Sequence, residues 1–263
     1  YEISLGLVGS EMCIRDSYSP VETDLYNPCV AGSRLGITPE QLRELPEGIE
    51  GLHFHVLCES RPEHLRLALE AVEQRFGHLL DRVKWLNMGG GHLMTHADYD
   101  CDELIALLRE FRSRHPHLRL ILEPGSAFTW RTGYLVSTVE DIVENGGVRT
   151  AMLDVSFACH MPDCLEMPYK PAIVGAHEPA EGEPRWRMGG TSCLAGDFYG
   201  DWAFDHELKV GERIVFEDMI HYTMVKTTMF NGVQHPSIVI VRRDGRTEVI
   251  REFGYEDYKN RMS

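Results

Sequence analysis

Residues able to bind or transform a small molecule follow three apolar stretches in the first half of the sequence. They are His55 in the stretch at residues 51–56, the triplet Gly89, Gly90 and Gly91 after residues 83–87, and Glu123 after residues 118–122. Three consecutive glycines leave backbone N–H groups uncovered by side chains, which suits a concave nest for a phosphate where a strand meets a helix. On its own such a triplet is more often a flexible turn, so the interpretation depends on its neighbours.

The elements that must position these residues alternate between strands and helices. Between the strand-like stretches, apolar residues recur at helical spacing, at Leu65, Leu69, Val72 and Phe76 and again at Leu104, Leu107, Leu108 and Phe111. We expect the first of these helices to end at Gly77. The order strand, helix, strand, helix, strand over residues 51–125 predicts a parallel α/β arrangement. Since sites of βα barrels lie where the strands end, the three groups above are predicted to share one rim.

The pattern changes after Gly125. Strand-like runs now follow one another without helices of comparable length, at residues 134–143, 148–155, 213–216, 237–241 and 247–251. The dipeptide Asp244-Gly245 between the last two runs is typical of a hairpin turn. We therefore predict an α/β domain over residues 18–125 and a mainly β domain over residues 126–263.

Composition and charge narrow the class of protein. The chain has 263 residues, of which 43% are hydrophobic and 25% charged, as is typical of a soluble globular protein. Its net charge of −15 argues against nucleic-acid binding, which needs a basic face. Seven cysteines without CxxC spacing favour a reducing compartment, and we expect a cytoplasmic protein. No apolar run approaches the roughly 18 residues of a membrane helix.

The first residues do not match the rest of the chain. Residues 1–17 read YEISLGLVGSEMCIRDS, with no start Met and no basic segment leading into an apolar core. The run resembles translated sequencing-adapter DNA. We expect residues 1–17 to be an artefact and the native sequence to begin near Ser17 or Tyr18; the alternative is a natural N-terminal strand.

Seven motifs resemble the pyridoxal-phosphate decarboxylases of the alanine racemase-like fold type, and most closely the carboxynorspermidine (carboxyspermidine) decarboxylases. They are GLHFHVLCES at 51–60, NMGGGH at 87–92, LEPG at 122–125, HMPDCLEMPYKP at 160–171, TSCLAGDFYGD at 191–201, FEDMIHYTMVKTTMFNGV at 216–233 and EFGYEDYK at 252–259. The resemblance implies part of a (β/α)8 TIM-like barrel, followed by a C-terminal β-sandwich or barrel-like domain. It also implies a homodimer with shared active sites.

The resemblance implies pyridoxal 5'-phosphate as cofactor and assigns residues to it. His55 would stack on the pyridine ring, and the glycine triplet with Gly125 would bind around the phosphate. Glu123 would pair with the pyridine nitrogen, because a nearby anion keeps that nitrogen protonated and the ring able to accept electrons. The hydroxyl of Tyr222 would reach the phosphate. Read without the family, His55 and Tyr222 are more often core residues, and Glu123 a helix cap.

Further residues are assigned to substrate and catalysis by the same resemblance. Cys193 would cross the dimer interface and take part in proton return to the substrate carbon. Cys193 and His55, which stacks on the cofactor ring, would be the catalytic residues. Asp163 and Asp197 would face cationic amino groups of the substrate. Ser126 stands where this subfamily more usually carries Glu and where diamine or diaminopimelate decarboxylases often carry Arg.

The implied reaction is decarboxylation of carboxynorspermidine or carboxyspermidine to norspermidine or spermidine, in polyamine biosynthesis. The alternative is another basic amino acid, such as diaminopimelate or ornithine. Two carboxylates and no Arg after LEPG favour a polyamine-like cation over a substrate with a second carboxylate. The lysine that forms a Schiff base with the cofactor in this family lies on the first barrel strand and has no counterpart among the lysines here. They are Lys84, Lys170, Lys209, Lys226 and Lys259. We therefore expect this chain to be inactive, and a non-catalytic fragment is a further alternative.

A metal site is a competing interpretation. His53 and His55 form an HxH pattern on a strand, and Cys159, His160 and Cys164 lie close in sequence. Neither group has the additional ligands at the spacing that a metal-dependent hydrolase or a zinc site needs. We predict that the protein holds no metal.

Overall fold

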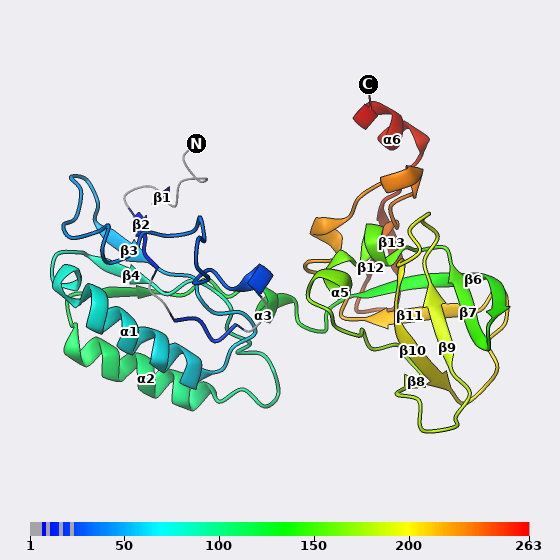
Figure 1. Ribbon diagram of the computed structural model, residues 1–263, viewed down its shortest axis with the longest axis horizontal. Helices are drawn as coiled ribbons and strands as arrows, with labels where there is room; N and C mark the ends of the chain where they lie inside the picture. The colour runs from blue at the N-terminus through cyan, green and yellow to red at the C-terminus, as the bar shows by residue number, and fades with distance from the viewer. Residues whose placement is uncertain (1–6, 9–10, 16–17, 22–23, 263) are drawn as a thin grey trace. The chain divides into compact units, whose positions relative to one another are not determined.

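The structure, a computed structural model, describes residues 7–8, 11–15, 18–21 and 24–262. The chain divides into two compact units, Tyr1–Trp130 and Arg131–Ser263 (Figure 1). The short helix α3 (Ser126–Thr129) belongs to the first unit. The observed division therefore follows Trp130 instead of Gly125.

The first unit is built on a five-stranded sheet in the order β1-β2-β3-β4-β5. The strands are β1 (Leu7–Val8), β2 (Glu11–Cys13), β3 (Gly51–His53), β4 (Trp85–Asn87) and β5 (Arg119–Ile121). Strands β2 to β5 are parallel, whereas β1 pairs antiparallel with β2. The predicted parallel α/β arrangement is confirmed. Of the segment expected to be an artefact, residues 1–6, 9–10 and 16–17 lie outside the described residues.

Helices α1 (Pro62–Leu80) and α2 (Cys101–Arg114) connect the last three strands and lie side by side on one face of the sheet (Figure 1). The predicted apolar faces are buried, and α1 continues past Gly77 because Leu79 and Leu80 extend its buried face by another turn. Each large side chain buried in this way contributes about 1.5–3 kcal/mol. Asp100 caps α2 by accepting the Glu103 N–H at 2.8 Å, as its position before the helix predicts.

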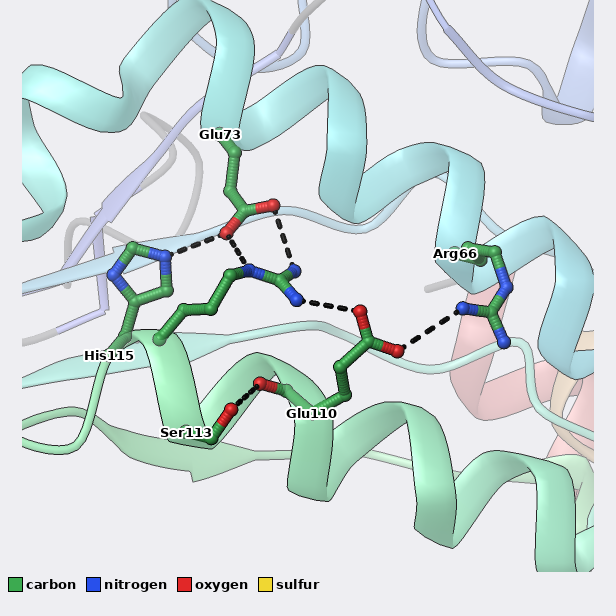
Figure 2. A network of polar contacts seen from close by, with 6 residues as sticks. Arg66, Glu73, Glu110, Ser113 and His115 are labelled. Atoms are coloured by element: carbon green, nitrogen blue, oxygen red, sulfur yellow. Dashed lines mark hydrogen bonds and ion pairs between the residues drawn. The ribbon is translucent and has the colours of Figure 1, made fainter.

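A polar network joins the outer surfaces of α1 and α2 (Figure 2). Glu73 on α1 accepts from Arg114 Nε and Nη2 at 2.9 and 3.0 Å and contacts His115 Nε2 at 2.8 Å. Desolvation by itself would raise the pKa of Glu73, but the hydrogen bonds from Arg114 and His115 outweigh it and lower the pKa. Arg114 also contacts Glu110, which lies 3.5 Å from Arg66. These contacts link α1 to α2 on the side of the helices that faces solvent.

The second unit contains a six-stranded sheet in the order β11-β6-β7-β9-β10-β8. Its strands are β6 (Tyr134–Asn145), β7 (Val148–Leu153), β8 (Ala176–His177), β9 (Trp186–Gly189), β10 (Phe198–Phe204) and β11 (Arg213–Glu217). Only β7 and β9 pair in parallel among these neighbours in the described chain. Strands β8 to β10 lie in a region rich in glycine, proline and charge, where the sequence predicted none.

Short helices and a hairpin complete the second unit. Helices α4 (Phe157–His160) and α5 (Pro162–Glu166) follow β7, and α6 (Tyr255–Met262) closes the chain. Strands β12 (Ile238–Val241) and β13 (Thr247–Arg251) form the predicted hairpin, with Gly245 at a φ of +81°. The 3-10 turns are η2 (Asp24–Tyr26) in the first unit, and η3 (Met224–Lys226) and η4 (Phe230–Gly232) in the second. Within the described residues, no helix has the length and apolarity that crossing a membrane requires.

Candidate functional site

The register of the first sheet brings the predicted cofactor residues to one rim. His53 of β3 pairs with Asn87 of β4, and Asn87 pairs with Ile121 of β5. His55, Gly89 and Glu123 each lie two residues beyond these partners. The Glu123 N–H donates to the Gly89 carbonyl at 2.8 Å, and the Gly90 N–H donates to His55 Nδ1 at 2.9 Å. The prediction that the three strand ends share a rim is confirmed.

The glycine triplet is required by close packing of these strand ends. Gly89 and Gly91 have φ angles of +66° and +89°, which side-chain-bearing residues rarely adopt. A Cβ on Gly89 would lie 2.6 Å from the Phe54 carbonyl oxygen, and one on Gly91 would lie 2.2 Å from that of Leu57. The triplet is therefore a fixed backbone segment, and the flexible-turn interpretation does not describe it.

The backbone N–H groups of the triplet are only partly available to an anion. The Gly89 N–H donates to Asn87 Oδ1 at 3.0 Å, and the Gly90 N–H donates to His55 Nδ1. Our expectation of uncovered N–H groups is wrong for these two, because side chains of the neighbouring strand ends already accept from them. The Gly91 N–H has no acceptor in the part of the chain that the structure describes.

The contacts of His55 at this rim favour a neutral imidazole. Its ring is exposed, but its Nδ1 edge packs against Gly89 and Gly90. This desolvation, followed by the nearby His53, lowers the pKa of His55, although Glu123 acts in the opposite direction. An Nδ1 that accepts the Gly90 N–H must be unprotonated, so the geometry and the lowered pKa agree. A neutral, exposed ring is suited to stacking on an aromatic ligand.

Glu123 is held by residues that the sequence analysis did not assign to the site. Its Oε1 accepts from Asn87 Nδ2 at 2.8 Å, and its Oε2 lies 3.7 Å from His53 Nε2. Asn87 Nδ2 also lies 3.2 Å from Glu11 Oε1. The Glu123 side chain remains 52% exposed, so its carboxylate is accessible to a ligand. The position of Asn87 directly before the glycine triplet was the available signal for its role.

Lysine is scarce at this rim. Lys84 is the only lysine in residues 1–130, and it precedes β4, whereas the candidate site follows β4. Its ammonium pairs with Glu50, which precedes β3. Lys84 therefore lies at the amino ends of the strands, opposite the rim that carries His55 and Glu123.

Two predicted substrate carboxylates have partners inside the second unit. Asp163 is buried and accepts from Lys226 Nζ at 2.7 Å; Lys226 also pairs with Glu166. Asp197 is 3% exposed, and its two carboxylate oxygens accept backbone N–H groups. The donors are Ala158, at 2.9 Å from Oδ1, and Ser192, at 3.0 Å from Oδ2. Both carboxylates thus hold the unit together, and their contact with substrate stays a prediction.

The remaining predicted residues are accessible or lie at element ends. Cys193 is an exposed free thiol directly after Ser192, so the loop that carries it is tied down by Asp197. Tyr222 is exposed, with its ring 5.8 Å from that of His221. Ser126 follows Gly125 as the first residue of α3 in the first unit. Within the described residues, no group of three or more His, Cys, Asp or Glu side chains could hold a metal ion.

We predict that two buried histidines, one in each unit, make both units less stable in acid. His92 directly follows the triplet, and neither of its ring nitrogens has a hydrogen-bond partner among the described residues. Burial lowers the pKa of His92 to about 4, and burial likewise lowers that of His160 to about 4. In an unfolded chain these histidines bind protons near pH 6.5, whereas in the folded chain they bind them only near pH 4. Because acid then favours the unfolded state, the free energy of unfolding should fall between pH 6.5 and pH 4, by roughly 3 kcal/mol per histidine.

Urea unfolding at pH 7 and pH 4.5 measures this loss. His92→Gln should reduce the loss of stability on acidification, whereas the control His78→Gln, on the exposed surface of α1, should leave it as in the wild type. An equal loss in His92→Gln and in the wild type would show that His92 does not titrate as described.

Comparison with known proteins identifies the family. The model of the family described as "Pyridoxal-dependent decarboxylase, C-terminal sheet domain" matches residues 15–220. The chain belongs to the pyridoxal-dependent decarboxylase family. The resemblance inferred from the seven motifs is thereby confirmed, and the match extends across both units of the chain.

Individual decarboxylases share much of the chain. It is 59% identical over 250 residues to a carboxyaminopropylagmatine decarboxylase of Synechocystis sp., covering 95% of this chain and 65% of that protein. It is 41% identical to a carboxynorspermidine/carboxyspermidine decarboxylase of Campylobacter jejuni, covering 93% and 66%. The chain thus spans slightly less than two thirds of the length of these relatives.

Solved structures of decarboxylases share the fold. The crystal structure of carboxynorspermidine decarboxylase complexed with norspermidine from Campylobacter jejuni matches with a TM-score of 0.81 and 41% identity, covering 88% of this chain and 66% of that one. A diaminopimelate decarboxylase matches with a TM-score of 0.76 at 18% identity, which supports the fold alone. This chain therefore has the fold of these decarboxylases over the part of their structures that it matches.

Proposed function

We propose that this chain holds pyridoxal 5'-phosphate as part of a decarboxylase that removes the carboxylate of a carboxylated polyamine. The observation that carries the proposal is the rim at which the exposed His55, the Gly91 N–H and an accessible Glu123 lie together. The Gly91 N–H suits a phosphate, the His55 ring suits an aromatic ring, and the Glu123 carboxylate suits a protonated ring nitrogen. These residues therefore fit this cofactor. When bound, the cofactor supplies an electron-accepting ring for the electron pair left by the departing carboxylate.

Each residue at the rim has a distinct role in this proposal. The Gly91 N–H would donate to a phosphate oxygen, and the exposed His55 ring would pack against the cofactor ring. The Glu123 carboxylate would accept a hydrogen bond from the protonated pyridine nitrogen and, as a neighbouring anion, would favour that protonated state. Tyr222 adds a hydroxyl to the phosphate, and the exposed Cys193 thiol returns a proton to the substrate carbon; these two roles rest on the family resemblance.

The substrate we propose is carboxynorspermidine or carboxyspermidine, with norspermidine or spermidine as product. The relative named for these substrates and the matching crystal structure support this class. Carboxyaminopropylagmatine is a second candidate, which the 59% identical relative favours. Diaminopimelate and ornithine are not favoured, because the relatives named for them are each 27% identical.

The larger assembly is part of the same proposal. We expect the α/β unit to form part of a (β/α)8 TIM-like barrel and the β unit to be its sandwich or barrel-like partner domain, in a homodimer with shared active sites. All seven cysteines are free, which supports a reducing, cytoplasmic environment. Lys84 pairs with Glu50 at the far ends of the strands, so we expect cofactor binding by this chain without a bond to Lys84 and without steady turnover.

Calorimetric titration with pyridoxal 5'-phosphate and with pyridoxal tests the proposal. The phosphate ester should bind at least about tenfold more tightly, since a backbone N–H bond to a charged group contributes roughly 1.5–3 kcal/mol. Glu123→Gln should weaken binding of both compounds, because the carboxylate that pairs with the ring nitrogen is lost. Glu63→Gln is the control, a change on the surface of α1 that should leave both affinities unaltered. Equal affinity of the wild type for the two compounds would contradict the phosphate nest.

A further inference from the structure

We propose that Asn87 is a positioning residue that links the phosphate end of the cofactor site to Glu123. The inference rests on the proposed function and adds a residue to its site. A single amide joins both ends: Asn87 Oδ1 accepts the Gly89 N–H at 3.0 Å, and Asn87 Nδ2 donates to Glu123 Oε1 at 2.8 Å. The two partners follow different strands, because Gly89 lies two residues after β4 and Glu123 two residues after β5. Both contacts come from the last residue of β4.

Because Asn87 is buried, loss of these contacts would be costly. The residue is 3% exposed, so an amide left without partners would lose its hydrogen bonds to water without replacement. The amide group is planar, and its acceptor and donor are fixed relative to each other. Rotation of the side chain would therefore break the bond to Gly89 and the bond to Glu123 together. The position of the Glu123 carboxylate is coupled in this way to the conformation of the glycine triplet.

The second oxygen of Glu123 is less constrained. It lies 3.7 Å from His53 Nε2, which is beyond hydrogen-bond distance. With Oε1 fixed by Asn87 and the side chain half exposed, Oε2 is the oxygen available to a ligand. Asn87 thus selects which carboxylate oxygen meets the pyridine nitrogen and holds the other in place.

The charge of the residue at position 87 matters as much as its hydrogen bonds. Asn87→Asp keeps an acceptor for the Gly89 N–H but replaces the donor to Glu123 by a second carboxylate. Like charges at such a distance favour protonation of one member of the pair, which removes the anion that the pyridine nitrogen needs. Glu11 Oε1, 3.2 Å from Asn87 Nδ2, is a further carboxylate that faces this position. The variant therefore removes the amide donor to Glu123 and keeps the acceptor of the Gly89 N–H.

Binding of pyridoxal 5'-phosphate and thermal unfolding of the full chain test the inference together. Asn87→Asp should weaken cofactor affinity about tenfold, the effect of losing roughly one charge-assisted hydrogen bond. The double variant Asn87→Asp with Glu123→Gln recreates the bond with donor and acceptor exchanged. Its melting temperature should be higher than the value expected if the shifts of the two single variants simply added. Its cofactor affinity should stay low, because the carboxylate at position 123 is absent.

The outcomes separate this inference from the proposed function. A wild type that binds no pyridoxal 5'-phosphate would overturn the proposed function and with it the role of Asn87 toward the cofactor. A wild type that binds, with an Asn87→Asp variant of equal affinity, would overturn the role of Asn87 alone. Strictly additive melting temperatures in the cycle would likewise contradict a direct coupling between Asn87 and Glu123.

Discussion

Replacing Gly91 by alanine is expected to destabilise the first unit by about 3 kcal/mol or more and to abolish binding of pyridoxal 5'-phosphate. The added Cβ would lie 2.2 Å from the Leu57 carbonyl oxygen and 2.9 Å from the Cys58 nitrogen. Both are backbone atoms, so no side-chain rotation can relieve the contact. The φ angle of +89° adds a penalty of its own for any residue with a Cβ. Any shift that relieves these contacts moves the N–H that we assign to the phosphate.

Urea unfolding and cofactor titration measure the effect of Gly91→Ala. Gly77→Ala is the matched control: this glycine lies inside α1, and its added Cβ would meet no atom within 4 Å. In that helical position alanine should be neutral or stabilise by up to about 1 kcal/mol. A Gly91→Ala chain with wild-type stability and cofactor affinity would show that the triplet is not packed as described.

Replacing Asp197 by alanine is expected to destabilise the second unit by about 2–3 kcal/mol, because two partly buried backbone N–H groups lose a charged acceptor. The Ala158 and Ser192 N–H groups donate to the two oxygens of this carboxylate at 2.9 and 3.0 Å. Asp197→Asn should have an intermediate effect, since its amide keeps one acceptor and turns a donor toward the other N–H. The loop that carries Cys193 would lose its attachment to α4.

Thermal unfolding of these Asp197 variants is the measurement. Asp205→Ala serves as the control, because Asp205 is exposed and its carboxylate has no partner among the described residues. It should change stability by less than about 0.5 kcal/mol. If Asp197→Ala were as stable as Asp205→Ala, Asp197 would have no structural role. Its role would then be limited to the substrate contact that the family resemblance implies.

The rim of the first unit was predictable because it depends on periodicity. Alternating strands and helices put residues 55, 89–91 and 123 after parallel strands, and parallel strands share an edge. The hairpin at Gly245 followed equally from its Asp-Gly dipeptide. These inferences need only local chain geometry, which short-range sequence patterns determine.

The partners of the polar groups were not predictable in the same way. That Asn87 and His55 accept from the triplet depends on the side-chain rotamers of residues at the ends of two strands, β3 and β4. That Asp197 and Asp163 are satisfied internally depends on burial, which a carboxylate in a loop motif does not reveal. Family resemblance assigns such residues to substrate, whereas the structure shows the contacts that they make in the fold.

A crystal structure of this chain with pyridoxal 5'-phosphate tests the central claim most directly. The account predicts the phosphate at the Gly91 N–H, the pyridine ring against His55, the ring nitrogen facing Glu123, and no covalent bond to Lys84. A phosphate bound away from the glycine triplet, or a cofactor joined to Lys84 at the opposite ends of the strands, would contradict it.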